Sequence, residues 1–293
     1  MRNSSTGDFP VDSEVLRLIQ FGIHEDVQSG DITTELTINS SSTAAARFLL
    51  KTDGVVCGLP ILRLVFDEFS TDINLEFKVK EGEWVKADAI IATVDGPAHA
   101  LLAGERTALN FIQRLSGVAT LTRRYVERIA GTNARILDTR KTIPGWRVLD
   151  KYATRVGGAL NHRMGLYDMV MIKDNHITAM GGITEAVTQC VRELQGRPDI
   201  RIEVEARSID DVHEILSCTG VHRIMFDNFT PAQTAQAVQV VAKRLETEAS
   251  GGITYGNIRD YAEAGVDFIS VGAITHSAVA LDISMKLFVP KQR

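Results

Sequence analysis

Downstream of Thr120, short apolar runs rich in β-branched residues alternate with longer amphipathic stretches. This alternation is typical of repeated strand–helix units, in which the strands form a parallel sheet covered by the helices. Strands are predicted in the segments ARILDT, DMVMI, IRIEVEA, HRIMFD, TEA and DFISV. Helices are predicted between them at residues 147–160, 183–194, 209–217, 231–244 and 257–264. Six such units are fewer than the eight of a complete barrel, so the pattern predicts an α/β fold of the incomplete, open α/β-barrel type.

The pattern upstream is different and predicts a separate N-terminal α+β domain. Strand-like runs, separated by Asp-Gly and Glu-Gly turns, are AAARFLLK, GVVCG, INLEFKV and AIIATVDG. Helices are predicted at residues 11–22, 59–69 and 98–115. We therefore expect an N-terminal domain at residues 1–117 and an α/β-barrel domain at residues 118–274. A last helix, at residues 278–288, is expected within a segment 275–293 that packs back on the first domain.

The composition is that of a globular protein and gives no general affinity for a polyanion. The chain has 293 residues, 44% of them hydrophobic, and a formal net charge of −5, so neither nucleic acid nor an anionic membrane is an expected partner. No stretch approaches the ~20 apolar residues of a membrane span, and the first residues lack the apolar core of a secretion signal. The three cysteines are far apart and have no C-x-x-C spacing, which favours buried thiols in a cytoplasmic protein.

Polar, charged or glycine residues follow each of the six predicted strands. In chain order they are Arg140 and Lys141, then Lys173, Glu205, Asp227, then Ser250 with Gly251 and Gly252, and finally Gly272 with Ala273. Taken singly, each is best explained as a solvated loop residue or a turn. Because the carboxyl ends of parallel strands meet at one edge of a sheet, six in succession predict a shared site instead.

The residue types at this edge indicate phosphate and metal chemistry. The segments SGGIT and VGAITHS follow the last two strands, where backbone N–H groups at a helix start commonly hold a phosphate. Glu205 and Asp227, on neighbouring strands, are candidates either for a general acid–base pair or for holding Mg²⁺ through its water ligands. The adjacent phosphate loops favour the metal.

A strongly basic segment, residues 140–176, lies within this otherwise acidic chain. Arg147, Lys151 and Arg155 have helical spacing and are expected on an exposed helix face. Five cations stand at segment junctions instead: Arg140, Lys141, His162, Arg163 and Lys173. We expect these five to converge on a small ligand with several carboxylates or phosphates. An isolated histidine at position 162 would more often be a structural hydrogen-bonding residue, whereas beside Arg163 a ligand role is equally supported.

Nine strings of the chain resemble the quinolinate phosphoribosyltransferase family, also called carboxylating nicotinate-nucleotide pyrophosphorylases. In order they are EDVQSGDITT, ERTALNFIQRLSGVAT, DTRKTIPGWR, KYATRVGGALNHR, MIKDNH, EVEARS, FDNF, EASGGIT and ISVGAITHS. They span almost the whole chain, so the resemblance does not rest on a single motif. One departure is Ala159, where a third glycine would be familiar after Gly157 and Gly158; it affects loop geometry and no chemistry.

The resemblance implies an enzyme that combines quinolinate with phosphoribosyl pyrophosphate, giving nicotinate mononucleotide, pyrophosphate and CO₂ for NAD biosynthesis. It implies a homodimer or higher even oligomer. The implied quinolinate ligands are Thr139, Arg140, His162, Arg163 and Lys173, with Arg106 donated by the other subunit. The implied phosphoribosyl pyrophosphate ligands are Lys141, Glu205, Asp227, Ser250, Gly251, Gly252, Gly272, Ala273 and His276. The implied catalytic residues are Lys141, Lys173, Glu205 and Asp227, and the last two also hold Mg²⁺, through water.

Three alternatives share these features. An aldolase or isomerase on a phosphate-binding barrel would use Lys173 to form a Schiff base. A metabolite-binding or scaffold protein would keep the pocket without the chemistry, although the full set of charged strand ends argues against it. The same transfer to nicotinate, a monocarboxylate, would need fewer cations than the five candidates in this chain.

Overall fold

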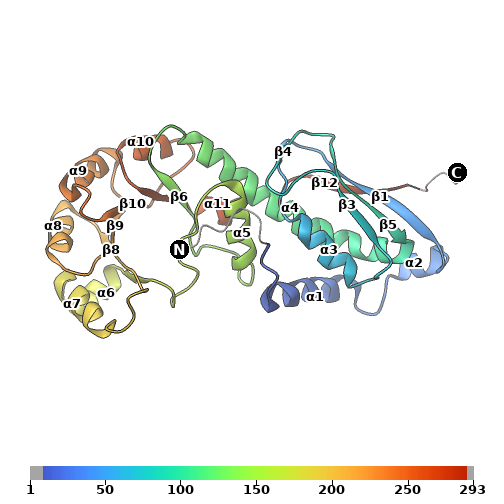
Figure 1. Cartoon of the computed structure of the whole chain (residues 1–293), viewed down its shortest axis with the longest axis horizontal. Coiled ribbons are helices and arrows are strands. Elements are labelled where there is room, and N and C mark those ends of the chain that lie inside the picture. Colours follow the sequence, from blue (N-terminus) through green and yellow to red (C-terminus); the bar gives the residue numbers. More distant parts are fainter. Residues whose placement is uncertain (1–8, 289–293) are drawn as a thin grey trace. The chain divides into compact units, whose positions relative to one another are not determined.

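A computed structural model describes residues 9–288, which fall into two compact units (Figure 1). In the first unit are residues 9–123, Thr142–Gly158 and 277–288, and in the second are Arg124–Lys141 and Ala159–His276. The chain thus leaves the second unit after Lys141 and returns to it at Ala159. The α/β-barrel domain expected from the sequence, residues 118–274, is instead a continuous stretch that includes Thr142–Gly158.

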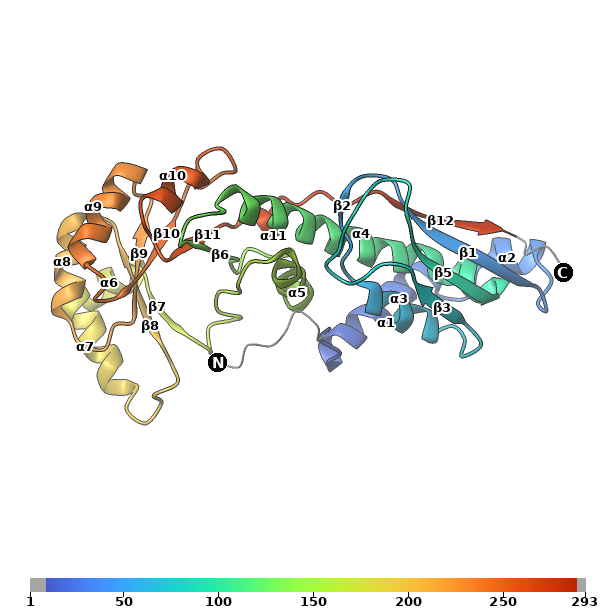
Figure 2. The same ribbon diagram turned by 45° about the horizontal axis from the view of Figure 1, so that its top comes forward.

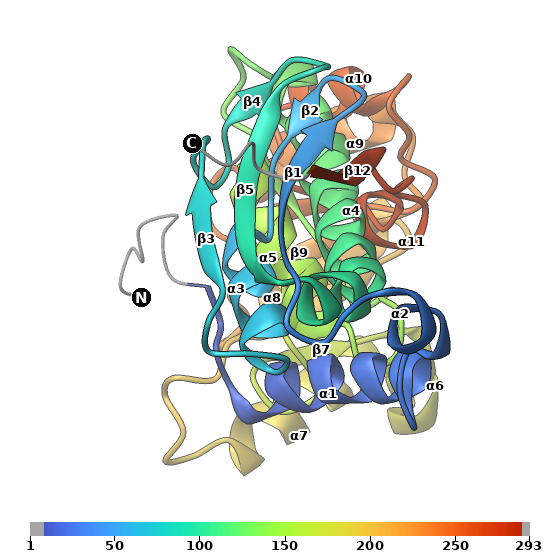
Figure 3. The ribbon, with the colours of Figure 1, turned by 90° about the vertical axis from the view of Figure 1, so that its right-hand side faces the viewer.

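The first unit is built on a four-stranded antiparallel sheet (Figure 3). In spatial order its strands are β12 (Ile283–Phe288), β1 (Thr43–Leu50), β5 (Ile90–Pro97) and β3 (Asn74–Phe77), and a separate pair is formed by β2 (Gly54–Val55) and β4 (Trp84–Val85). The prediction of a helix at residues 278–288 is wrong. Ile283 and Met285 are buried whereas Lys286 is exposed, because this segment alternates as a strand paired with β1. Residues 289–293 of the expected returning segment lie outside the described residues.

Helices pack beside this sheet and complete the core of the first unit. They are α1 (Ser13–Val27), α2 (Ile32–Thr37), α3 (Leu59–Asp67), α4 (Ala98–Arg128) and α5 (Arg147–Gly157). The helices predicted at residues 11–22, 59–69 and 98–115 are confirmed, with α1 and α4 extending further. α2 was not predicted. Asp12 caps α1 by accepting the backbone N–H groups of Glu14 and Val15 at 3.0 and 2.9 Å.

α5 is buried far more deeply than the sequence predicts. Arg147 and Arg155 are half-buried and Lys151 is 1% exposed, so the expected exposed basic face is wrong. The helix contributes Leu149 and Tyr152 to the hydrophobic core of the first unit. This packing explains why the segment carrying α5 belongs with that unit.

The second unit contains a six-stranded parallel sheet (Figure 2). In spatial order its strands are β6 (Arg135–Leu137), β11 (Phe268–Ser270), β10 (Glu246–Ser250), β9 (Arg223–Asp227), β8 (Ile202–Ala206) and β7 (Val170–Ile172). All six predicted strands are confirmed. Within residues 9–288, β6 and β7 are the two edges and do not pair with each other. The predicted α/β fold, an unclosed barrel-type sheet with a separate N-terminal domain, is therefore confirmed.

Helices of the second unit follow its strands along the chain, and α8, α9 and α10 lie outside the curved sheet (Figure 1). They are α6 (Asp174–Met180), α7 (Ile183–Glu193), α8 (Ile209–Ser217), α9 (Pro231–Val241), α10 (Ile258–Glu263) and α11 (Ala273–His276). Of these, α7 to α10 confirm predicted helices, and α6 and α11 were not predicted. The hydroxyls of Ser208 and Thr230 cap α8 and α9. Across residues 9–288, every helix is too short or too polar to span a bilayer.

Candidate active site

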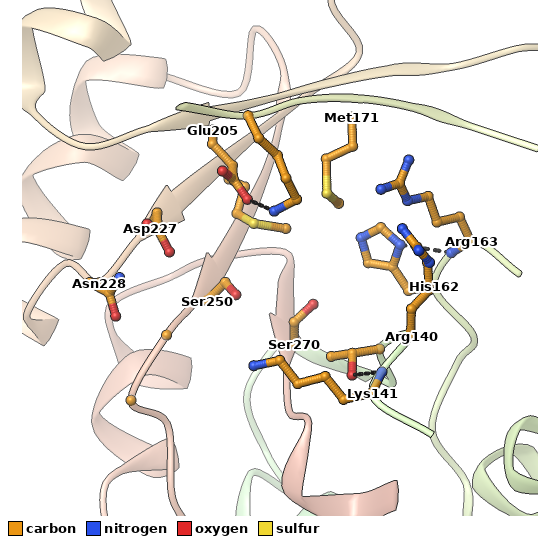
Figure 4. A pocket seen from close by; sticks show the side chains of 15 residues that line it. Arg140, Lys141, His162, Arg163, Met171, Glu205, Asp227, Asn228, Ser250 and Ser270 are labelled. Atoms are coloured by element: carbon orange, nitrogen blue, oxygen red, sulfur yellow. Dashed lines mark hydrogen bonds and ion pairs between the residues drawn. The ribbon is translucent and has the colours of Figure 1, made fainter. Parts of the chain in front are cut away.

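A cavity of about 420 Å³ lies at the carboxyl edge of the parallel sheet (Figure 4). Residues at or near the ends of all six strands line it: Thr139, Arg140, Lys141, His162, Arg163, Met171, Lys173, Glu205, Met225, Asp227, Asn228, Ser250, Gly251, Gly252 and Ser270. The lining includes every predicted site residue of the second unit except Gly272, Ala273 and His276. Apart from Gly272 and Ala273, the strand-end residues predicted to share a site line this one cavity.

Lys173 and Glu205 both line the cavity and form an ion pair. Glu205 lies on the same side of the cavity as Asp227 (Figure 4). Lys173 precedes α6, and its backbone N–H is donated to Nδ1 of His176 at 3.0 Å, which fixes the start of the helix. The Glu205 side chain is 7% exposed, against 40% for Lys173. The ammonium of Lys173 therefore balances the charge of a largely buried carboxylate. Asp227 contributes a second carboxylate at the end of the neighbouring strand.

The Ser250–Gly251–Gly252 turn needs its glycines. Gly251 and Gly252 have left-handed φ angles of 92° and 62°, and a Cβ on Gly251 would collide with Oδ1 of Asn228. Asn228 is itself left-handed, with φ of 59°, and donates its backbone N–H to the Ser250 carbonyl at 2.8 Å. The turn is thus a backbone surface that a ligand can approach closely.

Lys141 is held beside the last strand of the sheet. Its backbone N–H is donated to Oγ1 of Thr139 at 3.0 Å, and its carbonyl accepts the Thr275 hydroxyl at 2.8 Å. A Cβ on Gly272 would lie 3.1 Å from Cδ of Lys141 and 3.2 Å from the ring of His276. Gly272 and His276 therefore stand next to a cavity residue without lining the cavity themselves.

Arg140 and Arg163 bring two guanidinium groups to the opposite wall (Figure 4). Burial and the positive charge of Arg140 lower the pKa of Arg163. Nη1 of Arg163 donates to the carbonyl of Met169 at 3.1 Å, which anchors the side chain. Two arginines that repel each other in a cavity form a site that an anionic group between them would stabilise.

Both parts of the chain match models of one protein family. Residues 118–286 match the model described as the quinolinate phosphoribosyl transferase C-terminal domain, and residues 31–116 match the N-terminal domain of the same description. The chain belongs to the quinolinate phosphoribosyltransferase family. Over 286 residues it is 41% identical to "Quinolinate phosphoribosyltransferase [decarboxylating] 1b" of Nicotiana tabacum, covering 92% of this chain and 81% of that protein.

Other members of the quinolinate phosphoribosyltransferase family are similar at the same level. "Nicotinate-nucleotide pyrophosphorylase [carboxylating], chloroplastic" of Arabidopsis thaliana is 42% identical over 286 residues, covering 92% of this chain and 82% of that protein. The crystal structure of NadC from Streptococcus pyogenes superposes with a TM-score of 0.92 at 35% identity, covering 96% of this chain and 99% of that one. The whole two-unit chain, and not the barrel alone, is shared with these proteins.

Beneath the cavity of this family member lies a buried charged cluster that was not predicted. It consists of Glu203 in β8, Arg223 in β9, Glu248 in β10, Ser270 at the end of β11, and His162. Both glutamates are fully buried. Nε2 of His162 lies 3.1 Å from Oε2 of Glu203 and 3.6 Å from Oε1 of Glu248, and Arg223 Nη1 donates to Glu248 Oε2 at 2.8 Å. The cluster links four adjacent strands below the ligand site.

Charge in this cluster is balanced by close contacts. Burial opposes a charged His162, but the two carboxylates outweigh it and raise the pKa of His162 to about 9. Burial and the charge of Glu248 raise the pKa of Glu203 to about 7. For Glu248, His162 and Arg223 outweigh burial and lower the pKa. Glu248 is therefore the ionised carboxylate of the pair, and Glu203 the one nearer to neutrality.

The ring orientation of His162 follows from its other nitrogen. The backbone N–H of Arg163 is donated to Nδ1 at 2.7 Å, which places the ring proton on Nε2, facing Glu203. The carboxylates favour a second proton, but on Nδ1 that proton would meet the Arg163 N–H, so the hydrogen-bond geometry assigns the neutral ring in this arrangement. Imidazole and two carboxylates are also a possible metal-ligand set. A protonated Nε2 is a hydrogen-bond donor and not a metal ligand, which argues against a metal here.

Arg106 is placed in α4, within the first unit.

Four residues line the cavity without having been predicted: Met171, Met225, Asn228 and Ser270. The two methionines give the cavity its apolar surface, which suits a flat ring.

Proposed function

We propose that this chain transfers the phosphoribosyl group of phosphoribosyl pyrophosphate to quinolinate with loss of CO₂, giving nicotinate mononucleotide and pyrophosphate. One observation carries the proposal. In a member of this family, a single cavity brings together four cations, Arg140, Lys141, Arg163 and Lys173, two carboxylates and a glycine turn. The number of cations favours a dicarboxylate over nicotinate. The amine of Lys173 is engaged in an ion pair with Glu205, which disfavours a Schiff base.

Quinolinate is proposed to bind at the basic wall. Arg140 and Arg163 would each offer two N–H donors to a carboxylate, the geometry that guanidinium groups favour. Thr139 and Lys173, which line the same cavity, would complete the hydrogen bonds to the two carboxylates. His162 belongs to the same wall.

Phosphoribosyl pyrophosphate is proposed to bind at the opposite side. The backbone N–H groups of the turn from Ser250 to Gly252 would hold the 5-phosphate, since left-handed glycines let a phosphate approach the backbone. Lys141 would face the pyrophosphate. Support for a second phosphate contact comes from Gly272, Ala273 and His276 at the start of α11, beside Lys141.

We propose that Glu205 and Asp227 hold Mg²⁺ through water molecules. Their donor set fits this ion, because Mg²⁺ prefers hard oxygen ligands and keeps several of its waters. Lys173 already pairs with Glu205, which favours contact through water over direct coordination. Bound Mg²⁺ would supply positive charge to the leaving pyrophosphate.

The residues of the cavity match the charges that develop during the transfer. As the bond from C1 of the ribose to pyrophosphate breaks, positive charge grows on the sugar and is stabilised by the carboxylates of Glu205 and Asp227. Negative charge grows on the pyrophosphate and is stabilised by Lys141 and Lys173. The quinolinate nitrogen then forms the new bond to C1.

Decarboxylation is proposed to need no side-chain base. Once alkylated, the ring nitrogen is positive and stabilises the electron pair that the departing CO₂ leaves on the adjacent ring carbon. That carbon then takes a proton from water. Positioning and exclusion of bulk water are then sufficient. A point variant that accumulates the carboxylated mononucleotide would contradict this step.

We also propose a homodimer, or a higher even oligomer, in which Arg106 of one subunit completes the quinolinate site of another. The support is family likeness and the position of Arg106 outside the unit that carries the cavity. A cytoplasmic location is proposed from composition alone; the Arabidopsis relative is named chloroplastic.

The testing experiment incubates the purified protein with quinolinate, phosphoribosyl pyrophosphate and Mg²⁺ and follows nicotinate mononucleotide and CO₂ together. Equal formation of both products is expected, with no product when nicotinate replaces quinolinate. Product from nicotinate and none from quinolinate would change the assigned substrate from quinolinate to nicotinate. Absence of product from both acids, or a borohydride-trapped adduct on Lys173, would overturn the proposal.

A further inference from the structure

Glu203 and Glu248 have no part in the reaction proposed above, yet both carboxylates are fully buried directly below its cavity. Keeping an ionisable group in such a place costs several kcal/mol unless close partners compensate. We infer that Glu203 is a positioning residue of the quinolinate site: it orients the ring of His162, and His162 in turn fixes Arg163. The inference rests on the proposed function.

The ring of His162 is turned toward protein groups through both nitrogens. Nδ1 accepts the Arg163 backbone N–H at 2.7 Å, and Nε2 lies 3.1 Å from Glu203. The side chain is 5% exposed. A histidine held in this way acts on a ligand through Arg163, and not through a ring nitrogen of its own.

Arg163 is the residue through which Glu203 and His162 influence quinolinate binding. Its backbone is held by His162 and its Nη1 by the Met169 carbonyl at 3.1 Å, while the rest of the guanidinium lines the cavity near Arg140 (Figure 4). Bidentate binding of a carboxylate depends on the placement of this planar group. A small shift of its backbone would therefore weaken quinolinate binding more than phosphate binding.

The backbone of His162 has a separate anchor. Its N–H is donated to Oδ1 of Asp138 at 2.8 Å, and Asn161 Nδ2 donates to Oδ2 of the same carboxylate at 2.6 Å. Removing Glu203 would thus release the imidazole ring while the segment itself stays attached to the end of β6. We expect a local loss of orientation, and no loss of the fold.

The test compares Glu203→Leu with Glu203→Gln. Leucine removes the acceptor facing Nε2, while Arg223 keeps its pairs with Glu246 and Glu248. Glutamine keeps an oxygen in its place. Glu246→Gln is the matched control, because Glu246 also pairs with Arg223, at 3.0 Å, but its side chain is 36% exposed.

For Glu203→Leu we expect the KM for quinolinate to rise about tenfold or more, with the KM for phosphoribosyl pyrophosphate and the melting temperature near wild type. Glu203→Gln and Glu246→Gln should each stay within about threefold of wild type. An unchanged quinolinate KM in Glu203→Leu, or an equal rise in both KM values, overturns the positioning role while the activity stands. Wild-type protein that does not turn over quinolinate overturns the proposed function and this inference with it.

Discussion

Lys173 connects the positive and negative groups of the cavity, because it lines the cavity and also forms an ion pair with Glu205. Lys173→Met keeps the length of the side chain, removes its charge and leaves Glu205 unpaired at 7% exposure. We expect kcat/KM to fall by on the order of 10²-fold or more. The measurement is steady-state kinetics with both substrates.

The matched control for this change is Arg207→Met. Arg207 forms only a distant, exposed pair with Asp174 at 3.9 Å, so its removal should change kcat/KM less than twofold or so. Equal losses in the two variants would mean that Lys173 contributes only general positive charge.

Gly251 tests the phosphate turn. Gly251→Ala places a methyl group against Oδ1 of Asn228 at a φ of 92°, so the turn must move, and we expect the KM for phosphoribosyl pyrophosphate to rise by about tenfold. Gly196→Ala is the control, since Gly196 has a similar φ of 91° but open space around it. An equal rise of this KM in both variants would show that backbone strain alone, and not the shape of the turn, causes the rise.

The strand-end residues of the site were predictable because parallel strands bring their carboxyl ends to one edge. Glu203 and Glu248 were not, because they lie inside strands, where that rule does not apply. A signal was present: Glu203 with Glu205, and Glu246 with Glu248, place two acids on one face of strands that should be apolar throughout. Pairing of the acids with Arg223 and His162 depends on tertiary contacts and has no local pattern.

At the level of elements, α3 has an unusual N-terminal cap. Its N-cap residue is Gly58, which has no side chain, and the carboxylate of Glu81 accepts the backbone N–H groups of Gly58 and Leu59 at 2.6 and 3.0 Å. It also accepts the Tyr152 hydroxyl at 2.8 Å. A remote carboxylate therefore replaces the usual local cap.

Glu81→Ala should lower the free energy of unfolding of the first unit by about 1–2 kcal/mol, the usual cost of a lost cap. Urea denaturation followed by circular dichroism measures it. Glu83→Ala is the control, because Glu83 accepts only the Lys80 N–H in an exposed turn and should change stability by less than about 0.5 kcal/mol. Equal effects would argue that Glu81 does not cap α3.

Asp31 caps α2 and makes that helix sensitive to acid. The Thr34 hydroxyl and backbone N–H, donated to the Asp31 carboxylate, lower its pKa below the usual value. A lowered pKa in the folded state means that the charged cap stabilises the protein above the unfolded pKa of about 3.9, and that this contribution is lost as pH falls through the folded value. Asp31→Ala should therefore be less stable than wild type at pH 7, with the gap closing below pH 4. A gap that stays constant on acidification would show that ionisation of Asp31 is not involved.

Most elements were predictable from hydrophobic spacing, and the failures have physical causes. The six strands of the second unit are short apolar runs, as expected of a sheet covered on both faces. α6 has no buried residue, so there was no apolar stripe to detect. The prediction of a helix over the last strand, β12, fails because both periods can be fitted to a short run with few apolar positions.

For the whole molecule, the proposed dimer makes a quantitative prediction. Arg106→Ala and Lys173→Ala should each be inactive alone, because each removes a residue of the same composite site. If subunits exchange at random in an equal mixture, half of the dimers contain both variants and each has one intact site, so about a quarter of wild-type activity should return. Kinetics after mixing, with size-exclusion chromatography, measure it, and no recovery despite exchange would contradict the shared site.

The division of the chain was only partly predictable. A change of pattern near the middle of α4 indicated two domains, but the segment Thr142–Gly158 belongs to the first unit although it lies between strands of the second. Its helix α5 looks like any amphipathic helix of a strand–helix repeat. Only its packing against core residues such as Tyr152 decides where it belongs, and sequence spacing does not encode that choice.

The pairing order of the strands has a consequence for biosynthesis. β7, β8, β9, β10 and β11 pair in the order in which they leave the ribosome, but β6, made before all of them, pairs with β11 alone. In the first unit, one edge of β1 likewise pairs with β12, which is synthesised much later. Contacts between distant segments form slowly and leave strand edges exposed in the meantime. A nascent chain stalled before Phe268 should therefore display β6 and one edge of β1 to chaperones, and the two sheets are completed only once β11 and β12 have been made.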